Sequence, residues 1–431
     1  MKKIALISLG CVKNQVDSEA ILALFKEPDF KIVDNLEDSD AIIINTCGFI
    51  EPAVREAIDT IYEAAEYNKI LVVVGCFVER FYKELDDPAF PHVDLWVRFK
   101  DEYKYLPQMI QALFSGEKVA PKFDIFDRIP SESNYFSYIK ISEGCDNFCS
   151  FCTIPFIRGR FVSLPEDDIV AYAKKVVAEG GKEIVLIGQD PTSYGKDLKD
   201  ENINLVHLLK RIEPIEGLEK IRMLYLYPDG ITDELIEFVK THKKMSRYFD
   251  IPVQHCSDRI LKLMNRRDTK ASTEEVLNKI KKEIPDVILR TTLIVGFPGE
   301  TLDDFNELKE FINKYKFNHL GVFTYSKEEE TKSAKFPNHI PEEEKIRRKE
   351  EIMQIQARIS YEQNKALVGK EFNAFIHKIN NNDYSVRCDY NAPDDIDGNV
   401  ILKTDKVHQV GDLVKIKIEK AFVYDLIASE L

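Results

Sequence analysis

Long apolar runs, abundant cysteine and an excess of positive charge are all missing from this 431-residue sequence. No apolar stretch reaches the roughly 18 residues that predict a membrane-spanning helix. The opening MKKIALISLG has only about seven apolar residues before charged ones follow, so it predicts a first β-strand rather than a secretory signal. Eight cysteines are too sparse for a disulfide scaffold, which favours a reducing cytoplasm and no membrane association.

The charge balance limits the class of partner. Lys and Arg total 60 against 74 Asp and Glu, which gives a net charge of −14. Attraction to nucleic-acid phosphates is therefore not built into the chain as a whole, and a basic partner suits it better. The length predicts about three domains.

Residues 1–125 alternate apolar strand segments with helical ones. The strand segments are KIALISL, AIIINT and ILVVVG, and helices are expected near 18–25 and 52–67. This rhythm predicts an α/β unit with a doubly wound parallel sheet.

A cysteine follows each of these three strand segments, as Cys11, Cys47 and Cys76. Ligands of open α/β sheets collect at the carboxyl ends of the strands, so loops far apart in sequence can meet in one crevice. Three buried thiols acting as small hydrophobes are the alternative. The recurrence at one topological place favours a metal site with three protein ligands.

The remainder of the chain divides into three further segments. Residues 131–340 contain six strand candidates separated by helices, which predicts a partial (β/α)6 barrel with its function on the loops after the strands. Residues 341–368 are charged and helical. Residues 369–431 contain short strands broken by Asn, Asp and Gly turns, which predicts a small β-barrel. The six strand candidates are SYIKIS, EIVLIGQ, IRMLYLY, YFDIPVQ, VILRTTLIVG and HLGVFTYS.

The stretch GCDNFCSFC places Cys145, Cys149 and Cys152 on one loop after the first of these strands. Three thiolates at this spacing can hold three irons of a cubane cluster and leave the fourth iron open for chemistry. A structural zinc site is the alternative, but it normally needs a fourth Cys or His nearby. The other two cysteines, Cys256 and Cys388, are expected to be ordinary buried or half-buried thiols.

Polar residues end the second, third and fourth barrel strands. They are Gln189 and Asp190, Tyr227 and Asp229, and Gln254 and His255. Each alone could be a satisfied structural residue, but as a set they predict the mouth of an active site. His255 is a weak candidate for a general base.

The pattern Cys-x-x-x-Cys-x-Phe-Cys resembles the signature of the radical S-adenosylmethionine (SAM) enzymes. The resemblance implies that the open iron chelates SAM, that Phe151 lies near the adenine, and that one electron cleaves SAM to a 5′-deoxyadenosyl radical. Gly180 and Gly181 resemble the glycine motif that meets the SAM amino group, although a glycine helix stop is an equal alternative. Ile294 and Gly296, in TLIVGFPGET, lie on the strand that relatives place against the adenine.

The whole chain resembles the methylthiotransferases, which combine a three-cysteine N-terminal domain, a radical SAM barrel and a C-terminal TRAM barrel. SLGCVKNQVDSE, NTCGFIEPAVREAIDTI and YDLIAS resemble the branch that modifies small-subunit ribosomal protein twelve on the β-carbon of an aspartate. The resemblance implies two 4Fe–4S clusters, one SAM as methyl donor and one as radical source, a sulfide source and a reduced electron donor such as flavodoxin or ferredoxin.

Two rival functions remain at this point: a tRNA adenosine methylthiotransferase with the same machinery, and a non-catalytic iron–sulfur electron carrier or scaffold. Residues 369–431 hold eight Lys and Arg against eleven Asp and Glu, with Asp394, Asp395 and Asp397 clustered. A tRNA-holding module should be basic, so an acidic barrel makes tRNA an unlikely partner and favours a basic ribosomal protein. Any basic contact from the loop after the cysteine triplet is expected to come from Arg158 and Arg160.

Overall fold

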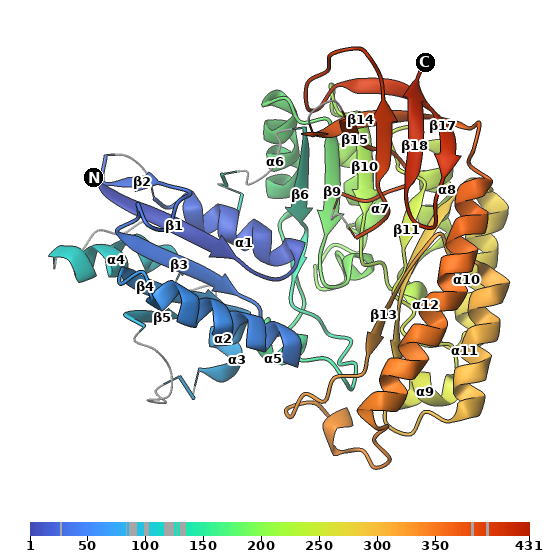
Figure 1. The fold of residues 1–431 in the computed structure, drawn as a ribbon, viewed down its shortest axis with the longest axis horizontal. Coiled ribbons are helices and arrows are strands. Elements are labelled where there is room, and N and C mark those ends of the chain that lie inside the picture. The colour runs from blue at the N-terminus through green and yellow to red at the C-terminus, as the bar shows by residue number, and fades with distance from the viewer. Residues whose placement is uncertain are drawn as a thin grey trace.

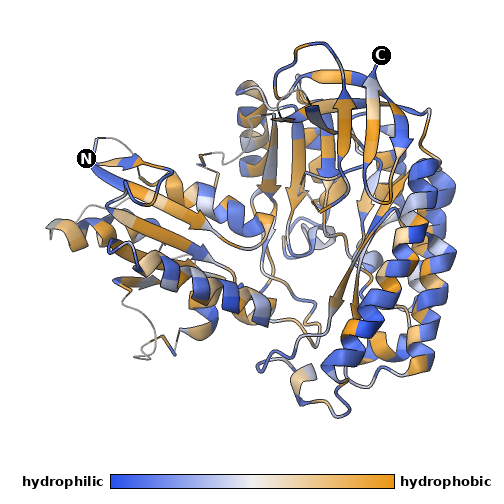
Figure 2. Cartoon of the chain, viewed as in Figure 1, coloured by the Kyte–Doolittle hydropathy of each residue, from blue (hydrophilic) through white to orange (hydrophobic). Residues whose placement is uncertain are grey.

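The computed structural model describes residues 1–25, 28–82, 84–85, 93–98, 103–115, 125–126, 128–129, 135–380, 383–393 and 396–431. An N-terminal α/β unit lies beside a larger central unit, and a small β-barrel covers one end of the central unit (Figure 1). Hydrophobic residues concentrate on the strands inside these units (Figure 2).

The N-terminal unit is built on a five-stranded parallel sheet with strand order β2-β1-β3-β4-β5. This confirms the predicted parallel sheet and adds two short strands that were not predicted, β2 and β5. The first helix, α1, starts right after Cys11, six residues before the predicted start. The strands are β1 (Lys2–Ser8), β2 (Phe30–Ile32), β3 (Ala41–Thr46), β4 (Ile70–Gly75) and β5 (Leu95–Val97), and the helices are α1 (Val12–Leu22), α2 (Glu51–Ala65), α3 (Cys76–Phe81) and α4 (Leu106–Ser115), with a 3-10 turn at Tyr103–Tyr105.

Strand β3 explains why helices cover both faces of this sheet. All six of its residues are buried, as is usual for a central parallel strand. Ile43 points into one core with residues of α1 and α4, whereas Ile42 and Ile44 point into the opposite core with residues of α2 and α3.

The central unit contains all six predicted strands, arranged as two parallel three-stranded sheets of order β10-β9-β6 and β11-β12-β13. The two sheets meet where Leu226 donates to the Asp250 carbonyl (2.9 Å) and Ile221 bridges Met245, which makes the partial barrel. The strands are β6 (Phe136–Lys140), β9 (Glu183–Ile187), β10 (Lys220–Met223), β11 (Tyr248–Asp250), β12 (Ile288–Val295) and β13 (His319–Thr324), with an antiparallel pair β7 (Ser142–Glu143) and β8 (Val162–Ser163).

Helices of the central unit are α5 (Ile154–Ile157), α6 (Glu166–Ala178), α7 (Leu205–Ile212), α8 (Asp233–Thr241), α9 (Asp258–Leu263), α10 (Lys270–Glu283) and α11 (Leu302–Tyr315), with 3-10 turns at Pro191–Ser193, Pro228–Gly230 and Ser333–Lys335. The long helix α12 (Glu342–Lys365) follows and spans about 36 Å at 1.5 Å per residue. It packs along α11 and β13 and buries Ile352 and Ile359 in the barrel core, so it is part of the barrel wall (Figure 1).

The last segment forms the predicted small β-barrel, closed in the order β14-β15-β16-β18-β17. Its last two strands, β17 and β18, are separated by a turn in which the Phe422 N–H donates to the Asp425 carbonyl (2.8 Å). The strands are β14 (Glu371–Asn380), β15 (Asp383–Arg387), β16 (Val400–Lys403), β17 (Leu413–Ala421) and β18 (Leu426–Glu430). Within the described ranges, no helix is both long and apolar enough to cross a membrane.

The small barrel contacts the amino ends of the central strands. Arg222 on β10 pairs with Glu183 on β9 (3.0 Å), and its Nη2 donates to the Cys388 carbonyl of the small barrel (2.9 Å). Both side chains of this ion pair are essentially inaccessible to solvent. A buried guanidinium therefore joins two central strands to the C-terminal barrel.

The acidic cluster predicted near residue 395 is only partly visible. Asp394 and Asp395 lie outside the described residues. The Asp397 side chain is only 2% exposed, accepts a hydrogen bond from the Tyr248 hydroxyl (2.7 Å) and faces the central unit. The expectation that Asp397 contributes to an outward acidic surface is wrong, because this carboxylate is part of the contact between the two barrels.

Replacing Glu183 with Ala should strongly destabilise the protein, because the buried Arg222 guanidinium would lose the one carboxylate that it directly pairs with among the described residues. Removing one partner of a buried ion pair costs about 3–5 kcal/mol. The midpoint of thermal unfolding should fall clearly, whereas Glu179→Ala, at an exposed position near the end of α6, should leave it almost unchanged. Equal midpoints in the two variants would contradict this account of the contact.

Candidate functional site

The first cysteine group lies where three neighbouring parallel strands end. Cys11 is the N-cap of α1, Cys47 follows β3, and Cys76 begins α3. Because β1, β3 and β4 are adjacent and parallel, their carboxyl ends open at one edge of the sheet. The structure thus brings the three strand-end cysteines to one place.

Close packing joins these three turns. Gly10 has φ +93°, and a Cβ built on it would lie 2.8 Å from the Cβ of Cys47 and 3.2 Å from its sulfur. Only glycine therefore fits beside this cysteine. Asn14 of α1 ties the turns together, because its Nδ2 donates to the carbonyls of Leu9 (2.7 Å) and Thr46 (3.1 Å).

The three thiols differ in their electrostatic surroundings. Burial raises the pKa of Cys76 to about 12, despite the nearby Arg158 guanidinium, and burial also raises the pKa of Cys47. Cys11 is exposed, yet the surrounding protein desolvates its sulfur, and this desolvation opposes ionisation. The nearby charges of Lys13 and Arg158 and hydrogen bonds from backbone N–H groups act in the opposite direction, and the pKa of Cys11 is lowered. Metal binding must displace the remaining thiol protons.

The second group, Cys145, Cys149 and Cys152, occupies the loop between β7 and α5. The loop is fixed on both sides. The Cys145 N–H donates to the Gly159 carbonyl (3.2 Å), and the Ser150 N–H and hydroxyl donate to the carbonyls of Met264 and Leu263, both at 2.8 Å.

The donor chemistry of both groups fits an iron–sulfur cluster. Each group supplies three cysteine sulfurs, and a cubane cluster takes each cysteine on a different iron.

Four buried charged residues connect the N-terminal unit to the central unit; we call them the charge cluster. Asp17 of α1 accepts from Lys140 (2.5 Å) and Arg158 (3.0 Å), and Glu143 also accepts from Lys140 (2.9 Å) and Arg158 (3.0 Å). None of the four side chains is more than 12% exposed. Two positive and two negative charges thus compensate one another inside the contact between the units.

Arg158 also reaches the first cysteine group. Its Nη2 lies 3.5 Å from the Cys76 sulfur and 3.1 Å from the Asn14 Oδ1. The expectation that Arg158 offers a basic surface contact is therefore wrong, because this guanidinium is internal. Arg160 does remain exposed, where it pairs with Asp146 (2.9 Å).

The two cysteine groups lie next to each other. The Thr153 hydroxyl, one residue after Cys152, donates to the Phe49 carbonyl, two residues after Cys47 (3.1 Å). The Lys13 ammonium lies 3.5 Å from the centre of the Tyr225 ring. Its positive charge favours the thiolate form of one cysteine from each group, Cys11 and Cys152. Burial still raises the Cys152 pKa overall. The loops that carry the two cysteine groups are therefore in direct contact.

Strand-end polar groups of the central unit are only partly satisfied. Gln189 donates to the charge cluster through Glu143 (3.3 Å). Among the described residues, no partner is found for Gln189 Oε1, Gln254 Oε1 or His255 Nε2, all of which are buried atoms. Buried polar atoms without partners are rare, so each of these three atoms has a hydrogen-bonding capacity that the described residues leave unused.

The other candidates for SAM contact lie on the cysteine loop, on β12 and on the loop after β12. Phe151 and Ile294 pack in one small apolar cluster with Phe297, and the Phe151 and Phe297 rings meet edge to face at 6.4 Å. Gly296 has φ +72°, and a Cβ there would overlap the side chain of Lys345. The cysteine loop and the predicted adenine strand are therefore in contact.

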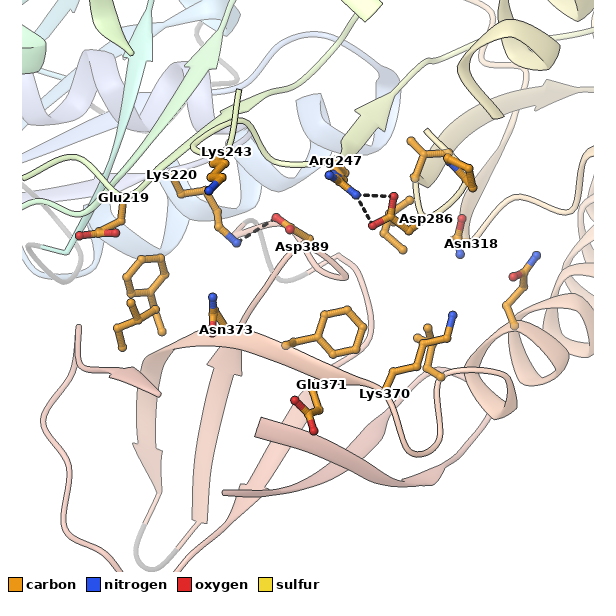
Figure 3. Close-up of a pocket in the computed structure, with 18 residues that line it drawn as sticks. Glu219, Lys220, Lys243, Arg247, Asp286, Asn318, Lys370, Glu371, Asn373 and Asp389 are labelled. Carbon is orange, nitrogen blue, oxygen red and sulfur yellow. Dashed lines mark hydrogen bonds and ion pairs between the residues drawn. The ribbon is translucent and has the colours of Figure 1, made fainter. Parts of the chain in front are cut away.

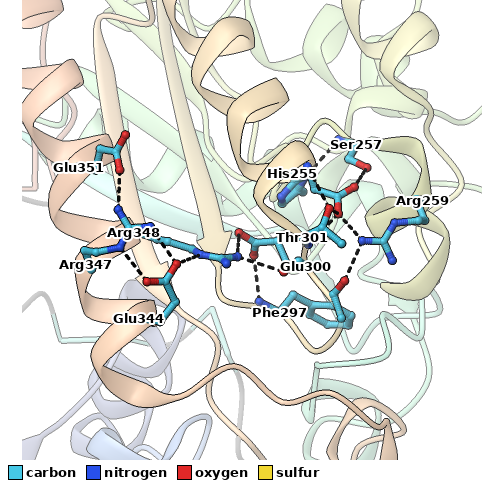
Figure 4. Close-up of polar contacts among 12 residues, drawn as sticks. His255, Ser257, Arg259, Phe297, Glu300, Thr301, Glu344, Arg347, Arg348 and Glu351 are labelled. Atoms are coloured by element: carbon cyan, nitrogen blue, oxygen red, sulfur yellow. Dashed lines mark hydrogen bonds and ion pairs between the residues drawn. The ribbon is translucent and has the colours of Figure 1, made fainter.

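Helix α12 holds this loop in position through buried polar contacts (Figure 4). Glu300 accepts from the Phe297 N–H (3.0 Å) and pairs with Arg348 of α12 (2.8 Å). Arg348 pairs in turn with Glu344 (2.7 Å). The long helix thus supports the site as well as the barrel wall.

The structure does not support the expected role of Gly180 and Gly181. They end helix α6, where their N–H groups donate to the Val177 and Val176 carbonyls, and they precede β9. Glu183 at the start of β9 pairs in register with Phe136 at the start of β6. The glycines therefore lie at the amino end of the strands, whereas the cysteine loop lies beyond the carboxyl end, so the helix-stop alternative explains them.

His255 does not qualify as a general base. Its Nδ1 accepts from the N–H groups of Cys256 and Ser257, both at 3.0 Å, so its proton is assigned to Nε2. Burial lowers its pKa to about 3. The ring is therefore neutral, and its Nδ1 lone pair already accepts hydrogen bonds from the backbone. Figure 4 shows it beside Ser257 at the edge of the loop network.

Sequence reasoning missed Arg80, which links the first cysteine group to the central unit. Its Nη1 donates to the Gly48 carbonyl beside Cys47 (2.8 Å), and its Nη2 pairs with Glu328 and Glu330 (both 2.7 Å). These partners are 248 and 250 residues away in sequence. No local pattern could have identified the contact.

A cavity of about 420 Å³ lies between the central unit and the C-terminal barrel (Figure 3). Its lining includes Lys220, Arg247 and Ile288, which stand at the amino ends of strands, and Lys370 and Asn373 of the small barrel. It is therefore at the opposite end of the strands from the cysteines. We assign it no part in the chemistry of the cysteine site.

Three family models match the chain: the uncharacterized protein family UPF0004 over residues 3–98, the radical SAM superfamily over 139–312 and the TRAM domain over 368–430. Similar curated proteins include the ribosomal protein uS12 methylthiotransferase RimO of Clostridium botulinum, 42% identical over 99% of this chain and 97% of that protein. The protein of the same name from Alkaliphilus oremlandii is 44% identical over 98% of both chains.

Solved structures agree on the fold. The radical SAM methyltransferase TsrM of Kitasatospora setae, with tryptophan and a SAM analogue bound, has a TM-score of 0.54 at 13% identity and covers 75% of this chain and 73% of its own. Its form with cobalamin and an iron–sulfur cluster also has a TM-score of 0.54 at 13% identity, over 89% of this chain and 80% of that chain. At this identity, the likeness concerns the fold alone.

The buried neutral His255 should make the protein sensitive to acid. Because its folded-state pKa lies below its unfolded value near 6.5, the unfolded chain takes up a proton that the folded chain does not. Its contribution to stability is complete above about pH 6.5 and is lost below it, by up to about 1.4 kcal/mol per pH unit down to about pH 3.

Thermal unfolding midpoints between pH 7.5 and 5 should therefore fall more steeply in the wild type than in His255→Gln, which has no group to titrate. His339→Gln, at an exposed position, should keep the wild-type slope. Identical slopes in all three proteins would show that His255 titrates normally.

Proposed function

The chain belongs to the ribosomal protein uS12 methylthiotransferase family, and from this premise we propose that it transfers a methylthio group to the β-carbon of an aspartate in ribosomal protein uS12. The family membership rests on more than 40% identity over nearly the whole chain. A carbon-bound hydrogen at that position is too weakly acidic for ordinary side-chain bases, which is why radical chemistry is required.

One observation carries this proposal: two separate three-cysteine groups lie side by side at one interface. The Thr153–Phe49 hydrogen bond and the charge cluster hold them together. A reaction that combines hydrogen abstraction with sulfur insertion needs both functions within reach of one substrate carbon. A single redox cluster in an electron carrier would not need this pairing.

Two 4Fe–4S clusters and SAM are the cofactors of this family, and the cysteine donor sets fit the clusters. When bound, these groups supply electron transfer, hydrogen abstraction and the methylthio group. We assign one cluster to Cys11, Cys47 and Cys76 and the other to Cys145, Cys149 and Cys152. Our proposed SAM contacts are Phe151, Gln189, Gln254, Ile294 and Gly296.

The protein's own residues position and shield these groups. Arg158 aims an N–H at the Cys76 sulfur, so it would donate to the ligand thiolate and compensate its charge. The unpartnered Oε1 atoms of Gln189 and Gln254 could accept from an ammonium group of SAM. Phe151 and Ile294 provide an apolar surface for a flat ring.

The proposed partners follow from the substrate and the cofactors. Ribosomal protein uS12 is the substrate, a reduced flavodoxin or ferredoxin supplies electrons, and a sulfide source supplies sulfur. tRNA is not expected as a substrate. We place the reaction in the cytoplasm, where ribosomal proteins and reduced thiols occur together.

Single cysteine substitutions should separate two half-reactions. Cys145→Ala should abolish SAM cleavage, because the cluster would lose a ligand. Cys47→Ala should retain SAM cleavage to 5′-deoxyadenosine but produce no methylthiolated substrate. Mass spectrometry of uS12 checks the product, since replacing hydrogen with a methylthio group adds about 46 Da on an aspartate.

Cys256→Ala is the matched control, because this buried thiol belongs to neither group. It should retain both half-reactions. A fully active variant at any of the six cysteines would contradict the scheme. The same mass gain on an anticodon stem-loop, with none on uS12, would overturn the substrate assignment but keep the chemistry.

A further inference from the structure

A positively charged depression lies on the outer side of the second cysteine loop. Its lining includes Arg259, Lys262 and Lys332 together with Ser150 and Asn265, and no acidic residue is among the described residues that line it. We call the three cationic residues the cation patch. The chain has a net charge of −14, so a surface depression whose described charged residues are all positive is unexpected and needs an explanation.

The backbone of the cysteine loop forms part of this depression. Ser150 lies directly after Cys149 and is bound on three sides: its N–H and hydroxyl donate to Met264 and Leu263, and its carbonyl accepts from the Ser333 N–H (2.9 Å). Lys262 precedes Leu263 and Lys332 precedes Ser333 in the sequence, so two cations of the patch are direct neighbours of residues that bond to Ser150. The patch is therefore one residue layer away from a proposed cluster ligand.

Two of the three cations are available to a partner. Lys262 and Lys332 are exposed, and in the described ranges neither forms an ion pair. Arg259 is different, because it donates to Asp304 and to the Gly299 carbonyl. Lys262 and Lys332 thus supply the charge that a partner would feel, and Arg259 supports the loop after β12.

We propose that the cation patch is the docking site of an acidic one-electron carrier protein that reduces the cluster on Cys145, Cys149 and Cys152. This inference rests on the proposed function. In the step, the reduced carrier loses one electron and the cluster gains it, and no covalent bond is formed or broken. The patch attracts the carrier's acidic surface and holds its redox centre near the loop.

Position favours an electron carrier over RNA as the anionic partner. An electron donor must approach the cluster closely, and this patch lies against the cluster loop itself. The flank of the same loop beyond Cys152 is covered by the N-terminal unit, since Thr153 bonds to Phe49. A ribosomal RNA contact would have no reason to be placed behind the redox centre.

Charge reversal at the patch tests the proposal. In Lys262→Glu/Lys332→Glu, the rate of cluster reduction by reduced flavodoxin should fall by roughly tenfold or more at low ionic strength, because electrostatic steering is lost. The difference from the wild type should shrink as salt is added. Stopped-flow absorbance of the anaerobically reconstituted protein measures the rate directly, without the methylthiolation reaction.

Two comparisons make the result specific. Lys174→Glu/Lys365→Glu changes the net charge equally, at exposed positions in α6 and at the carboxyl end of α12. Both positions lie far from α9 (Figure 1), so this variant should behave as the wild type. Dithionite, a small reductant that needs no docking site, should reduce the cluster and support SAM cleavage equally in all three proteins.

Equal flavodoxin rates in the patch variant and the wild type would overturn the proposal. If the patch variant kept the wild-type flavodoxin rate but bound a ribosomal RNA fragment more weakly, the proposal would also be overturned, and the patch would be assigned to RNA. If the wild type with dithionite cleaves no SAM, the proposed function fails, and the docking proposal fails with it. A loss confined to flavodoxin, with dithionite chemistry intact, supports the docking site.

Discussion

The buried charge cluster of Asp17, Lys140, Glu143 and Arg158 is the constraint on which the rest of the site depends. Its charges compensate one another fully only when the N-terminal and central units are in contact, because Asp17 belongs to one unit and Lys140, Glu143 and Arg158 to the other. Losing one partner would leave an uncompensated buried charge, which costs several kcal/mol. The cluster therefore sets the relative position of both cysteine groups.

In both units, the cysteines lie on loops at the carboxyl ends of parallel strands. The contact between the units brings these two sets of loops together. Parallel strands place loops at their carboxyl ends, so each unit gathers its functional residues at one edge. The amino ends of the central strands have a structural role, because Arg222, paired with Glu183, donates a hydrogen bond to the C-terminal barrel there. One end of the central strands thus carries chemistry, and the other carries an added domain.

The sequence was sufficient for features that depend on local spacing or a general topological rule. The parallel sheet, the six central strands, the C-terminal barrel and the position of Cys11, Cys47 and Cys76 after three neighbouring strands all belong here. Gly180 and Gly181 misled because a motif resemblance does not say at which end of a strand the residues lie. Arg158 and Arg80 could not be placed because their partners are 141 and about 250 residues away, and only the tertiary fold brings them together.

The separation of Asp17 and Arg158 in sequence also bears on how the protein is made. During synthesis at 5–20 residues per second, the ribosome needs roughly 7–28 s to extend the chain from the first residue to the second. For the last 82 residues of that interval, the nascent N-terminal segment has its three thiols but lacks the guanidinium that will face Cys76. The surroundings of these thiols are consequently complete only after the central strands emerge.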